Sequence, residues 1–306
     1  MIKKITSLDM HIHSTSSDGE DSPVEIVQKA YDLGLEMIAI TDHDSISGLE
    51  SGRQKAPDLG VEFVNGVELS VSLYHQDYKE GINPMEIHIL GYGFDDQNSE
   101  LNRILKENQE YRQFRAGEII FKLNSALFEE GKDQITNQEF RALQDNIEGS
   151  IGRPHLAKLL IEKGVVQDKI EAFKKYLIKC NVPKKELTFE EGCNLIRQAG
   201  GDVYLAHPHG DKDYSIMKIT EDIQAQEAII CGMAPHLDGI ECYHYDHTSE
   251  QSEQYVKIAN TLGLRISGGS DHHGGAERGK SDNPYLHFKS SMSFFIFNFP
   301  LFISNS

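Results

Sequence analysis

The segment ITSLDMHIHSTSSDG, residues 5–19, decides the fold class. Residues 5–13 are the first candidate β-strand, and the Ser, Asp and Gly residues after it are typical of a loop. A helix is expected next, because Ser22 and Glu25 match a capping box and Pro23 suits the first turn of a helix. A strand followed closely by a capped helix predicts an α/β protein built on a parallel sheet.

The same rhythm of strands and helices returns after a long helical stretch. Six further apolar runs are predicted strands, which makes seven in all: residues 37–41, 61–67, 86–92, 202–206, 239–243 and 264–267. Between the fourth and the fifth, apolar residues at helical spacing predict several helices in succession. We therefore expect the first part of a barrel in residues 1–98, an inserted helical subdomain in 99–194 and the rest of the barrel in 195–285. The Phe-rich segment 286–306 is an atypical tail, to which we assign no function.

The composition limits the classes of partner. The chain has 306 residues and a formal net charge of -18, so a broad surface for duplex nucleic acid is not expected. Its four cysteines contain no Cys-x-x-Cys pair, which fits reduced thiols in the cytoplasm. No signal peptide is evident at the N-terminus, and the apolar stretch 294–302 is too short to span a bilayer. We expect a cytoplasmic protein with no membrane partner.

Histidine and carboxylate side chains recur where the predicted strands end. His11 and His13 lie two residues apart on one strand, so both side chains point to the same face. In a barrel of parallel strands such ends converge on one face, where active sites are assembled. The mixture of imidazoles and carboxylates favours Mn²⁺, Zn²⁺ or Fe over Mg²⁺. The motifs at the strand ends are His11-x-His13, Asp18, Thr41-Asp42-His43-Asp44, Glu68, His207-Pro208-His209 and Asp271-His272-His273, and His88 adds a histidine on the fourth predicted strand.

In this order the motifs resemble those of the PHP family (polymerase and histidinol phosphatase), over about residues 7–96 and 190–275. The resemblance implies an α/β fold, a distorted seven-stranded (β/α)7 barrel, with a centre of two or three divalent metal ions. It also implies that Glu68 bridges two ions and that His43, Asp271 and His273 take part in catalysis. Carried over position by position, the implied metal ligands are His11, His13, Asp18, His43, Glu68, His88, His207, Asp271 and His273.

A further motif, Gly152-Arg153-Pro154-His155, lies in the predicted helical insertion. It is similar to an Arg-Pro-His motif of PHP phosphatases that act on 5'-nucleotides and nucleoside 3',5'-bisphosphates, and of 5'-3' exoribonucleases of short RNA. The similarity implies that Arg153 and His155 bind substrate and that Arg153 acts in catalysis, since a guanidinium can clamp a phosphate with two hydrogen bonds. The alternative is that both residues only cap and begin a helix whose first turn contains Pro154.

The activity implied is hydrolysis of phosphomonoesters by attack of a metal-bridging hydroxide. The expected partner is a small phosphorylated substrate: an AMP-like nucleotide, a nucleoside 3',5'-bisphosphate or the 5' end of a short RNA. Alternatives within the family are a histidinol-phosphate-type phosphatase and a cyclic phosphodiesterase. Alternatives of other kinds are a metal-dependent amidohydrolase and a non-catalytic, metal-stabilised nucleotide-binding module. The oligomeric state stays open.

Residues next to the motifs carry further expectations. One of Asp42 and Asp44 is expected to support a neighbouring metal ligand through a hydrogen bond. His244 and His247 follow the sixth predicted strand, and they either reach the substrate or belong to a solvated loop. No role is assigned to His209.

Overall fold

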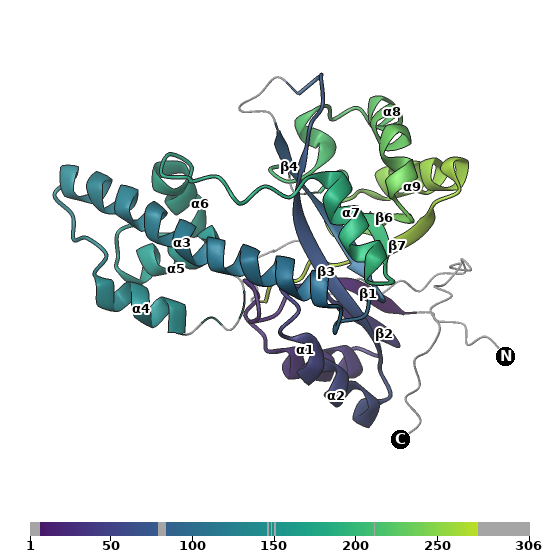
Figure 1. Cartoon of the computed structure of the whole chain (residues 1–306), viewed down its shortest axis with the longest axis horizontal. Helices are drawn as coiled ribbons and strands as arrows, with labels where there is room; N and C mark the ends of the chain where they lie inside the picture. Colours follow the sequence, from purple (N-terminus) through teal and green to yellow (C-terminus); the bar gives the residue numbers. More distant parts are fainter. Residues whose placement is uncertain are drawn as a thin grey trace.

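The computed structural model describes residues 7–274, apart from 79–83, 146, 148, 150 and 211. Each strand of its seven-stranded sheet pairs with the next strand along the chain. The two edges of the sheet meet, because Ile12 forms a bridge with His272 and the His13 amide donates to the His272 carbonyl at 2.8 Å. The predicted α/β fold with a nearly closed seven-stranded barrel is confirmed (Figure 1). The strands are β1 (Leu8–Ile12), β2 (Met37–Ile40), β3 (Glu62–Leu73), β4 (Met85–Tyr92), β5 (Asp202–Leu205), β6 (Gly239–His244) and β7 (Arg265–Gly269).

One strand runs against the predicted direction. β4 pairs antiparallel with both β3 and β5, whereas the other neighbouring pairs are parallel. The expectation of an all-parallel barrel is wrong here, because residues 74–84 are too few for the crossover that a parallel pair needs. β3 also extends further than predicted. Glu68 therefore lies within the β3–β4 pair rather than at a strand end, and His88 lies on β4 as expected.

Helices cover the outside of the barrel, and local sequence signals explain where they begin. Ser22 and Glu25 form the predicted capping box of α1 (Pro23–Asp32). Thr188 and Glu191 form that of α7 (Phe189–Gln198). The apolar faces of the helices share one buried core with the sheet, and each large aliphatic side chain buried there contributes about 1.5–3 kcal/mol. The other helices around the barrel are α2 (Leu49–Leu59), α8 (Ile223–Met233), α9 (Ser249–Leu262) and two short 3₁₀ helices (Ile216–Lys218 and Ala234–His236).

Helices α3 to α6 form an arm beside the barrel (Figure 1). The first half of α3 packs on the barrel core through Leu101 and Leu105, while its second half belongs to a separate apolar core shared with α5. Although α7 begins within the predicted insertion 99–194, it packs on the barrel, and the division of the chain into segments stays a prediction. The arm consists of α3 (Ser99–Glu129), α4 (Asn137–Asp145), α5 (Arg153–Glu162) and α6 (Lys169–Ala172), which a π-helical turn (Phe173–Leu177) continues.

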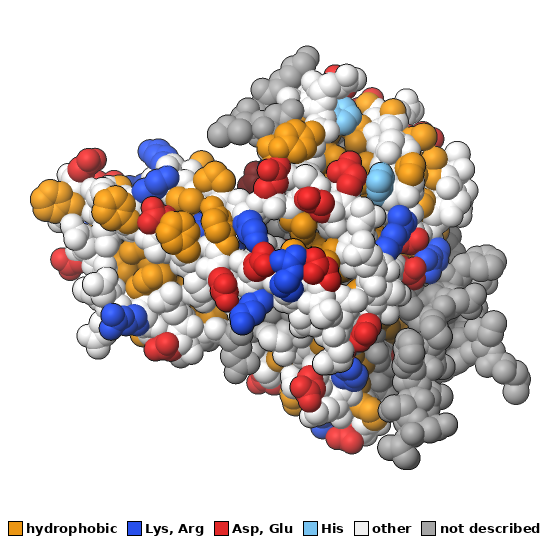
Figure 2. Space-filling model, viewed as in Figure 1, with side chains coloured by type: hydrophobic (Ala, Val, Ile, Leu, Met, Phe, Trp, Pro, Cys, Tyr) orange, Lys and Arg blue, Asp and Glu red, His pale blue; other side chains and the backbone are white. Residues whose placement is uncertain are grey.

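The arm also carries exposed aromatic side chains. Phe114, Phe121 and Phe128 lie seven residues apart on α3, and all three are exposed. Figure 2 shows hydrophobic side chains gathered over this part of the molecule. On the same face, acidic and basic side chains are interspersed (Figure 2), so this face offers no continuous basic surface to a nucleic-acid duplex.

Two expectations concern the chain ends and the membrane. The Phe-rich tail, residues 286–306, lies outside the described residues, as does the segment 275–285 that was expected to end the barrel. Of the helices that are described, none combines the length and the apolar character that crossing a lipid bilayer requires.

Candidate metal centre

The carboxylate of Glu68 lies at the middle of a ring of imidazoles. The closest approaches are 2.8 Å, between Oε2 and Nδ1 of His43, and 2.9 Å, between Oε1 and Nδ1 of His88. Glu68 is fully buried in β3, so the barrel holds its charge away from solvent. The ring nitrogens of five histidines lie within 3.4 Å of the two carboxylate oxygens: His11, His13, His43, His88 and His207.

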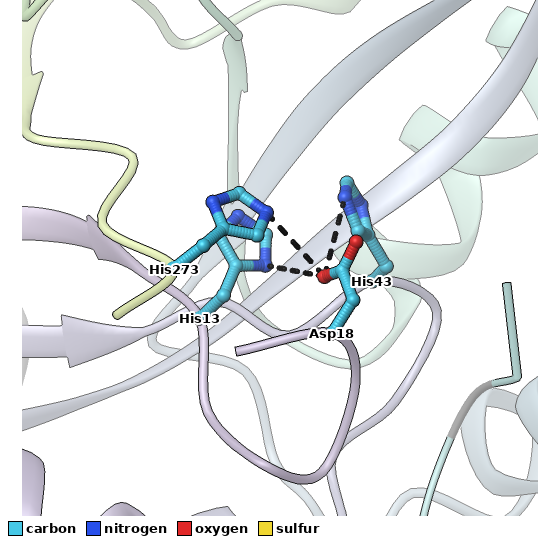
Figure 3. Close-up of side chains that lie close together, drawn as sticks. All are labelled: His13, Asp18, His43 and His273. Atoms are coloured by element: carbon cyan, nitrogen blue, oxygen red, sulfur yellow. Dashed lines mark ion pairs between the residues drawn. The ribbon is translucent and has the colours of Figure 1, made fainter. Parts of the chain in front are cut away.

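A second group surrounds Asp18, in the loop that follows β1 (Figure 3). Its Oδ1 atom is 3.4 Å from Nε2 of His273 and 3.9 Å from both Nδ1 of His13 and Nε2 of His43. The ligand atoms of these four residues all lie within 4.8 Å of one another, so a single ion could contact all of them. The loops after β1, β2 and β7 thus meet at one point, although the residues are far apart in the sequence.

Asp271 lies between the two groups. Its Oδ1 atom is 3.1 Å from Nε2 of His13 and 3.5 Å from Nδ1 of His273. Its backbone φ is 51°, and Asp44 and His207 also have positive φ. Such conformations cost on the order of 1–3 kcal/mol each in residues other than glycine. Among the residues that the structure describes, these three are the non-glycine residues with positive φ, and all three lie at this site.

The arrangement suits bound cations better than a hydrogen-bond network. Nε2 of His11 and Nε2 of His13 face each other at 3.2 Å, close to the ~3.3 Å expected for two nitrogens bound tetrahedrally to one ion. Buried polar atoms without a hydrogen-bond partner cluster in this part of the described structure, among them Nδ1 of His13, Oδ1 of Asp18 and Oε2 of Glu68. Such orphan atoms are costly, and a cation would satisfy them. The residues brought together here, called the metal centre below, are His11, His13, Asp18, His43, Glu68, His88, His207, Asp271 and His273.

The pKa values of the histidines in the centre depend on burial and on the neighbouring carboxylates. Burial alone would lower the pKa of His13, but hydrogen bonds and charges from Asp271 and Glu68 outweigh burial and raise the pKa to about 10. The pKa of His88 is raised to about 9 against the same effect of burial, because Glu68 lies beside it. Burial lowers the pKa of His43 to about 4, despite the nearby carboxylates. In the metal-free protein, some of the imidazoles therefore hold a proton at neutral pH and others do not.

We expect metal binding to release protons and to weaken as the pH falls. A histidine must lose its proton before it binds an ion. His13 and His88 carry a proton at neutral pH because their pKa values are raised, so the cost of removing it falls as the pH rises. The apparent affinity should therefore increase from about pH 6 to about pH 9. Calorimetry of Mn²⁺ binding in buffers of different ionisation enthalpy measures the affinity and the protons released. An affinity independent of pH contradicts this coupling.

Two buried carboxylates that the sequence analysis did not single out support the centre. Glu241 of β6 lies with Oε1 3.0 Å from Nδ1 of His11, and its Oε2 accepts a hydrogen bond from the His207 amide at 2.7 Å. Asp9 of β1 accepts from the Ser270 amide at 2.9 Å and so fixes the turn that follows β7. Each is an acidic residue within an apolar strand, which is the sequence signal that could have identified it.

Both aspartates of the Thr-Asp-His-Asp motif have a structural partner. Asp42 accepts hydrogen bonds from the hydroxyl groups of Ser14 and Ser17 at 2.6 and 2.5 Å, and it thereby holds the loop after β1 that carries a metal-centre aspartate. Asp44 pairs with Arg112 of α3. One aspartate therefore orders the barrel loop, and the other ties the arm to the barrel.

Basic side chains of the arm lie beside the centre. Arg153, the first residue of α5, donates a hydrogen bond to the hydroxyl of Tyr214. The ring of Tyr214 stacks on His88, with the ring centroids 4.6 Å apart. Lys184 pairs with Glu86 of β4 at 2.5 Å. Because His88 belongs to the metal centre, these contacts place a guanidinium and an ammonium group near it.

The other half of the Arg-Pro-His motif has a different environment. Nδ1 of His155 accepts a hydrogen bond from the Gly152 amide at 2.9 Å, which caps the start of α5. Burial lowers the pKa of His155, although the nearby Asp18 carboxylate opposes this effect. The ring therefore has a capping contact and also lies close to the charge of the metal centre.

His244, the last residue of β6, and His247, which follows the strand, do not form a solvated loop. His244 is buried, with Nε2 3.6 Å from Oδ2 of Asp271. Nδ1 of His247 lies 3.0 Å from the Cys242 carbonyl, and Nε2 of His247 accepts from the His209 amide at 3.3 Å. These residues thus pack behind the centre, and the solvated-loop interpretation is wrong for them.

Comparisons with known proteins agree with this geometry. The chain is 31% identical over 281 residues to a 5'-3' exoribonuclease of Haemophilus influenzae, which covers 89% of this chain and 93% of that protein. It is 30% identical over 286 residues to a 3',5'-nucleoside bisphosphate phosphatase of Chromobacterium violaceum, which covers 90% of each. A solved structure from Bifidobacterium adolescentis, described as a metal-dependent phosphoesterase, superposes with a TM-score of 0.70 at 26% identity, over 89% of this chain and 90% of that one.

These relatives confirm the enzyme class expected from the motifs, a metal-dependent hydrolase of phosphoric esters. The family model described as the PHP domain matches residues 9–182, which is more than half of the chain. The match begins within β1 and extends through the arm to the residues before α7, so it includes most of the metal centre and the Arg-Pro-His motif. The chain belongs to the PHP domain family.

Proposed function

We propose that the chain hydrolyses phosphomonoesters of nucleotides: AMP-like nucleotides, nucleoside 3',5'-bisphosphates or the 5' ends of short RNA. The relatives in Haemophilus influenzae and Chromobacterium violaceum support this class of substrate, because their names describe RNA and nucleotide substrates. Two or three Mn²⁺, Zn²⁺ or Fe ions would be held by the nine residues of the metal centre. His43, Asp271, His273 and Arg153 would act in catalysis, and Arg153 and His155 would contact the substrate.

The observation that carries this proposal is a pair of arginines without counter-charges beside the metal centre. Arg115 is buried and donates to neutral oxygens of residues 181–182, and Arg153 donates to the hydroxyl of Tyr214. Within residues 7–274 as described, neither guanidinium forms an ion pair with a carboxylate. Burial and the positive charges of Arg153 and Arg112 lower the pKa of Arg115 to about 10. A bound phosphate would supply the missing negative charge.

The ions and the basic side chains of the site would have different roles in the reaction. Divalent ions, when bound, supply Lewis-acid chemistry for the hydrolysis of a phosphate ester. Arg153 lies with its guanidinium carbon 5.4 Å from the centroid of the Phe173 ring, which restricts its orientation, and it can present two N–H donors to one phosphate. Arg112 and Lys184 pair with Asp44 and Glu86, so they add less net charge. The buried surroundings exclude water and strengthen these charge interactions.

Replacement of Arg153 by lysine is expected to lower kcat/KM for AMP by about 10- to 100-fold. Lysine keeps the positive charge but loses the paired donors, and a hydrogen bond to a charged group contributes about 1.5–3 kcal/mol. Arg103→Lys on the exposed face of α3, where Arg103 pairs with Glu100 and Glu107, is the matched control and should leave kcat/KM unchanged. An unchanged kcat/KM in the Arg153 variant would remove this residue from the substrate site.

The substrate class is tested with metal-loaded protein and four compounds: AMP, adenosine 3',5'-bisphosphate, histidinol phosphate and a cyclic nucleotide phosphate. We expect the highest kcat/KM for the first two, because the unpaired guanidinium groups suit a small and strongly charged substrate. Faster turnover of histidinol phosphate or of the cyclic compound would favour the alternatives within the family. Binding of AMP without release of phosphate would favour a non-catalytic module.

A further inference from the structure

Strand β6 places one carboxylate, that of Glu241, behind the metal centre. The side chain is completely buried, and its neighbours along the strand, Ile240 and Cys242, are apolar. Burial of a charged group is costly unless the charge is fully paired. The carboxylate has two partners: Oε1 lies 3.0 Å from Nδ1 of His11, and Oε2 accepts from the His207 amide at 2.7 Å and lies 3.3 Å from the same His11 nitrogen. The carboxylate therefore connects a residue of β1 with a residue that follows β5, both of which belong to the centre.

The contact with His11 decides which of its ring nitrogens can bind a metal. An ionised carboxylate only accepts hydrogen bonds, so Nδ1 of His11 must carry a proton where it meets Glu241. In the neutral ring, Nε2 then keeps its lone pair. That nitrogen lies 3.4 Å from Oε1 of Glu68 and 3.5 Å from Oδ1 of Asp271, so it points into the metal centre.

The contact with His207 acts on the backbone. His207 has a φ of 25°, a conformation that costs on the order of 1–3 kcal/mol and persists only where neighbouring groups hold it. Its amide donates to Glu241, while Nε2 of its ring lies 3.0 Å from Oε1 of Glu68. The hydrogen bond to the amide therefore helps to hold the turn that aims this imidazole at the centre.

We propose that Glu241 is a positioning residue of the metal centre, which fixes the tautomer of His11 and the backbone of His207 so that both rings present Nε2 to the ions. The inference rests on the proposed metal-binding roles of His11 and His207. It assigns a determinant of metal affinity to β6, a strand that contributes none of the nine residues of the centre.

Direct metal binding by Glu241 is the competing assignment. His11, Glu241 and His244 also present ligand atoms within 4.8 Å of one another. However, a neutral imidazole has one lone pair, and His11 directs it to the opposite side of its ring. Nδ1 of His244 accepts from the Asp246 amide at 3.2 Å, so the lone pair of this ring is also occupied. A positioning role and a ligand role predict different metal stoichiometries, which makes them separable by experiment.

The variant Glu241→Gln tests the proposal, because it keeps the shape of the side chain and removes its charge. The new amide group can donate to Nδ1 of His11 and would then favour a proton on Nε2, the nitrogen that faces the centre. We expect the dissociation constant for Zn²⁺, measured by competition with a chromophoric chelator, to rise about 10- to 100-fold. The number of Zn²⁺ ions bound at saturation should not change. Nitrogen NMR of the zinc-loaded protein should place a proton on Nδ1 of His11 in the wild type.

Asp238→Asn is the matched control, since Asp238 directly precedes β6 and bonds Arg197 and the Val203 amide far from the centre. It should lower thermal stability and leave Zn²⁺ affinity unchanged. If Glu241→Gln does not fold, Glu241→Asp should show the same kind of loss, because its shorter side chain cannot reach both partners.

Each outcome bears on the proposal. A wild-type dissociation constant in the Glu241 variant overturns the positioning role, and the loss of one bound ion at saturation shows that Glu241 is a ligand instead. A wild-type protein that binds no Zn²⁺ overturns the proposed function together with this inference. Wild-type binding with an unchanged variant overturns the inference alone.

Discussion

Replacement of Glu68 by glutamine is expected to abolish measurable release of phosphate from nucleotides. Five imidazoles approach the two oxygens of this buried carboxylate, the closest at 2.8 Å from His43 and 2.9 Å from His88. Glutamine has the same shape but no charge, so it could not supply the anionic ligand that Glu68 would offer to a bound divalent ion. Such ions would contribute several kcal/mol to catalysis as Lewis acids. At about 1.4 kcal/mol for each factor of ten, kcat/KM should fall at least about a thousandfold.

The measurement is phosphate release from AMP by the metal-loaded variant, together with its metal content by elemental analysis. Glu62→Gln is the matched control, since Glu62 is the first residue of the same strand and lies outside the centre. Circular dichroism of both variants separates loss of the site from loss of the fold. Activity of Glu68→Gln within tenfold of the wild type would show that the carboxylate is dispensable, and the assignment of the metal centre would then fail.

Local signals predicted the barrel and its helices well. Ser22 and Glu25 lie three residues apart, so the capping box of α1 depends only on neighbours in the chain. The same holds for His11 and His13, whose common face follows from the alternation of side chains along a strand. Contacts between residues only two or three positions apart can be predicted without knowing the fold.

The direction of β4 could not be predicted from its own residues, because an apolar run looks the same in either direction. The available signal was the short connection of residues 74–84, which cannot carry a crossover helix. Glu68 was expected at a strand end but lies inside the longer strand β3, whereas His88 lies on β4, as expected. They reach the centre from within the β3–β4 pair, where Glu68 lies opposite Leu90 and His88 opposite Ser70.

The charges that the arm brings to the site depend on long-range packing. Arg112 and Arg115 lie on the buried side of α3, between apolar residues such as Leu105 and Ile119. Two arginines on a mainly apolar stripe, which also contains Asn108, are a sequence signal of a buried polar site, but the sequence does not say what they face. Only the fold shows that Arg112 meets Asp44 of the barrel.

Substitution of Asp271 is expected to have the second large effect on activity. The charge of this residue and its backbone conformation can be tested by separate substitutions. The loss of the carboxylate in Asp271→Ala is expected to lower kcat/KM at least about a thousandfold, for the same reason as in the variant of Glu68. Its Oδ1 atom lies 3.1 Å from Nε2 of His13. Burial would raise the pKa of Asp271, but the charges of His273 and His11 outweigh burial and hold the pKa well below its usual value. The group is therefore ionised at any pH used for the assay.

Comparison of Asp271→Asn with Asp271→Ala separates the effect of losing the charge from the effect of straining the backbone of the turn. The φ of 51° lies in the left-handed region, which asparagine adopts more readily than alanine, by about 1–2 kcal/mol. Phosphate release and thermal melting are measured for both variants. If only the alanine variant lost activity, Asp271 would serve to shape the turn rather than to bind an ion. Equal loss of activity in both, with a lower melting temperature for alanine alone, is the result we expect, because Nε2 of His13 faces the carboxylate, and the contact of the His273 ring with the Asp271 carbonyl is open to both variants.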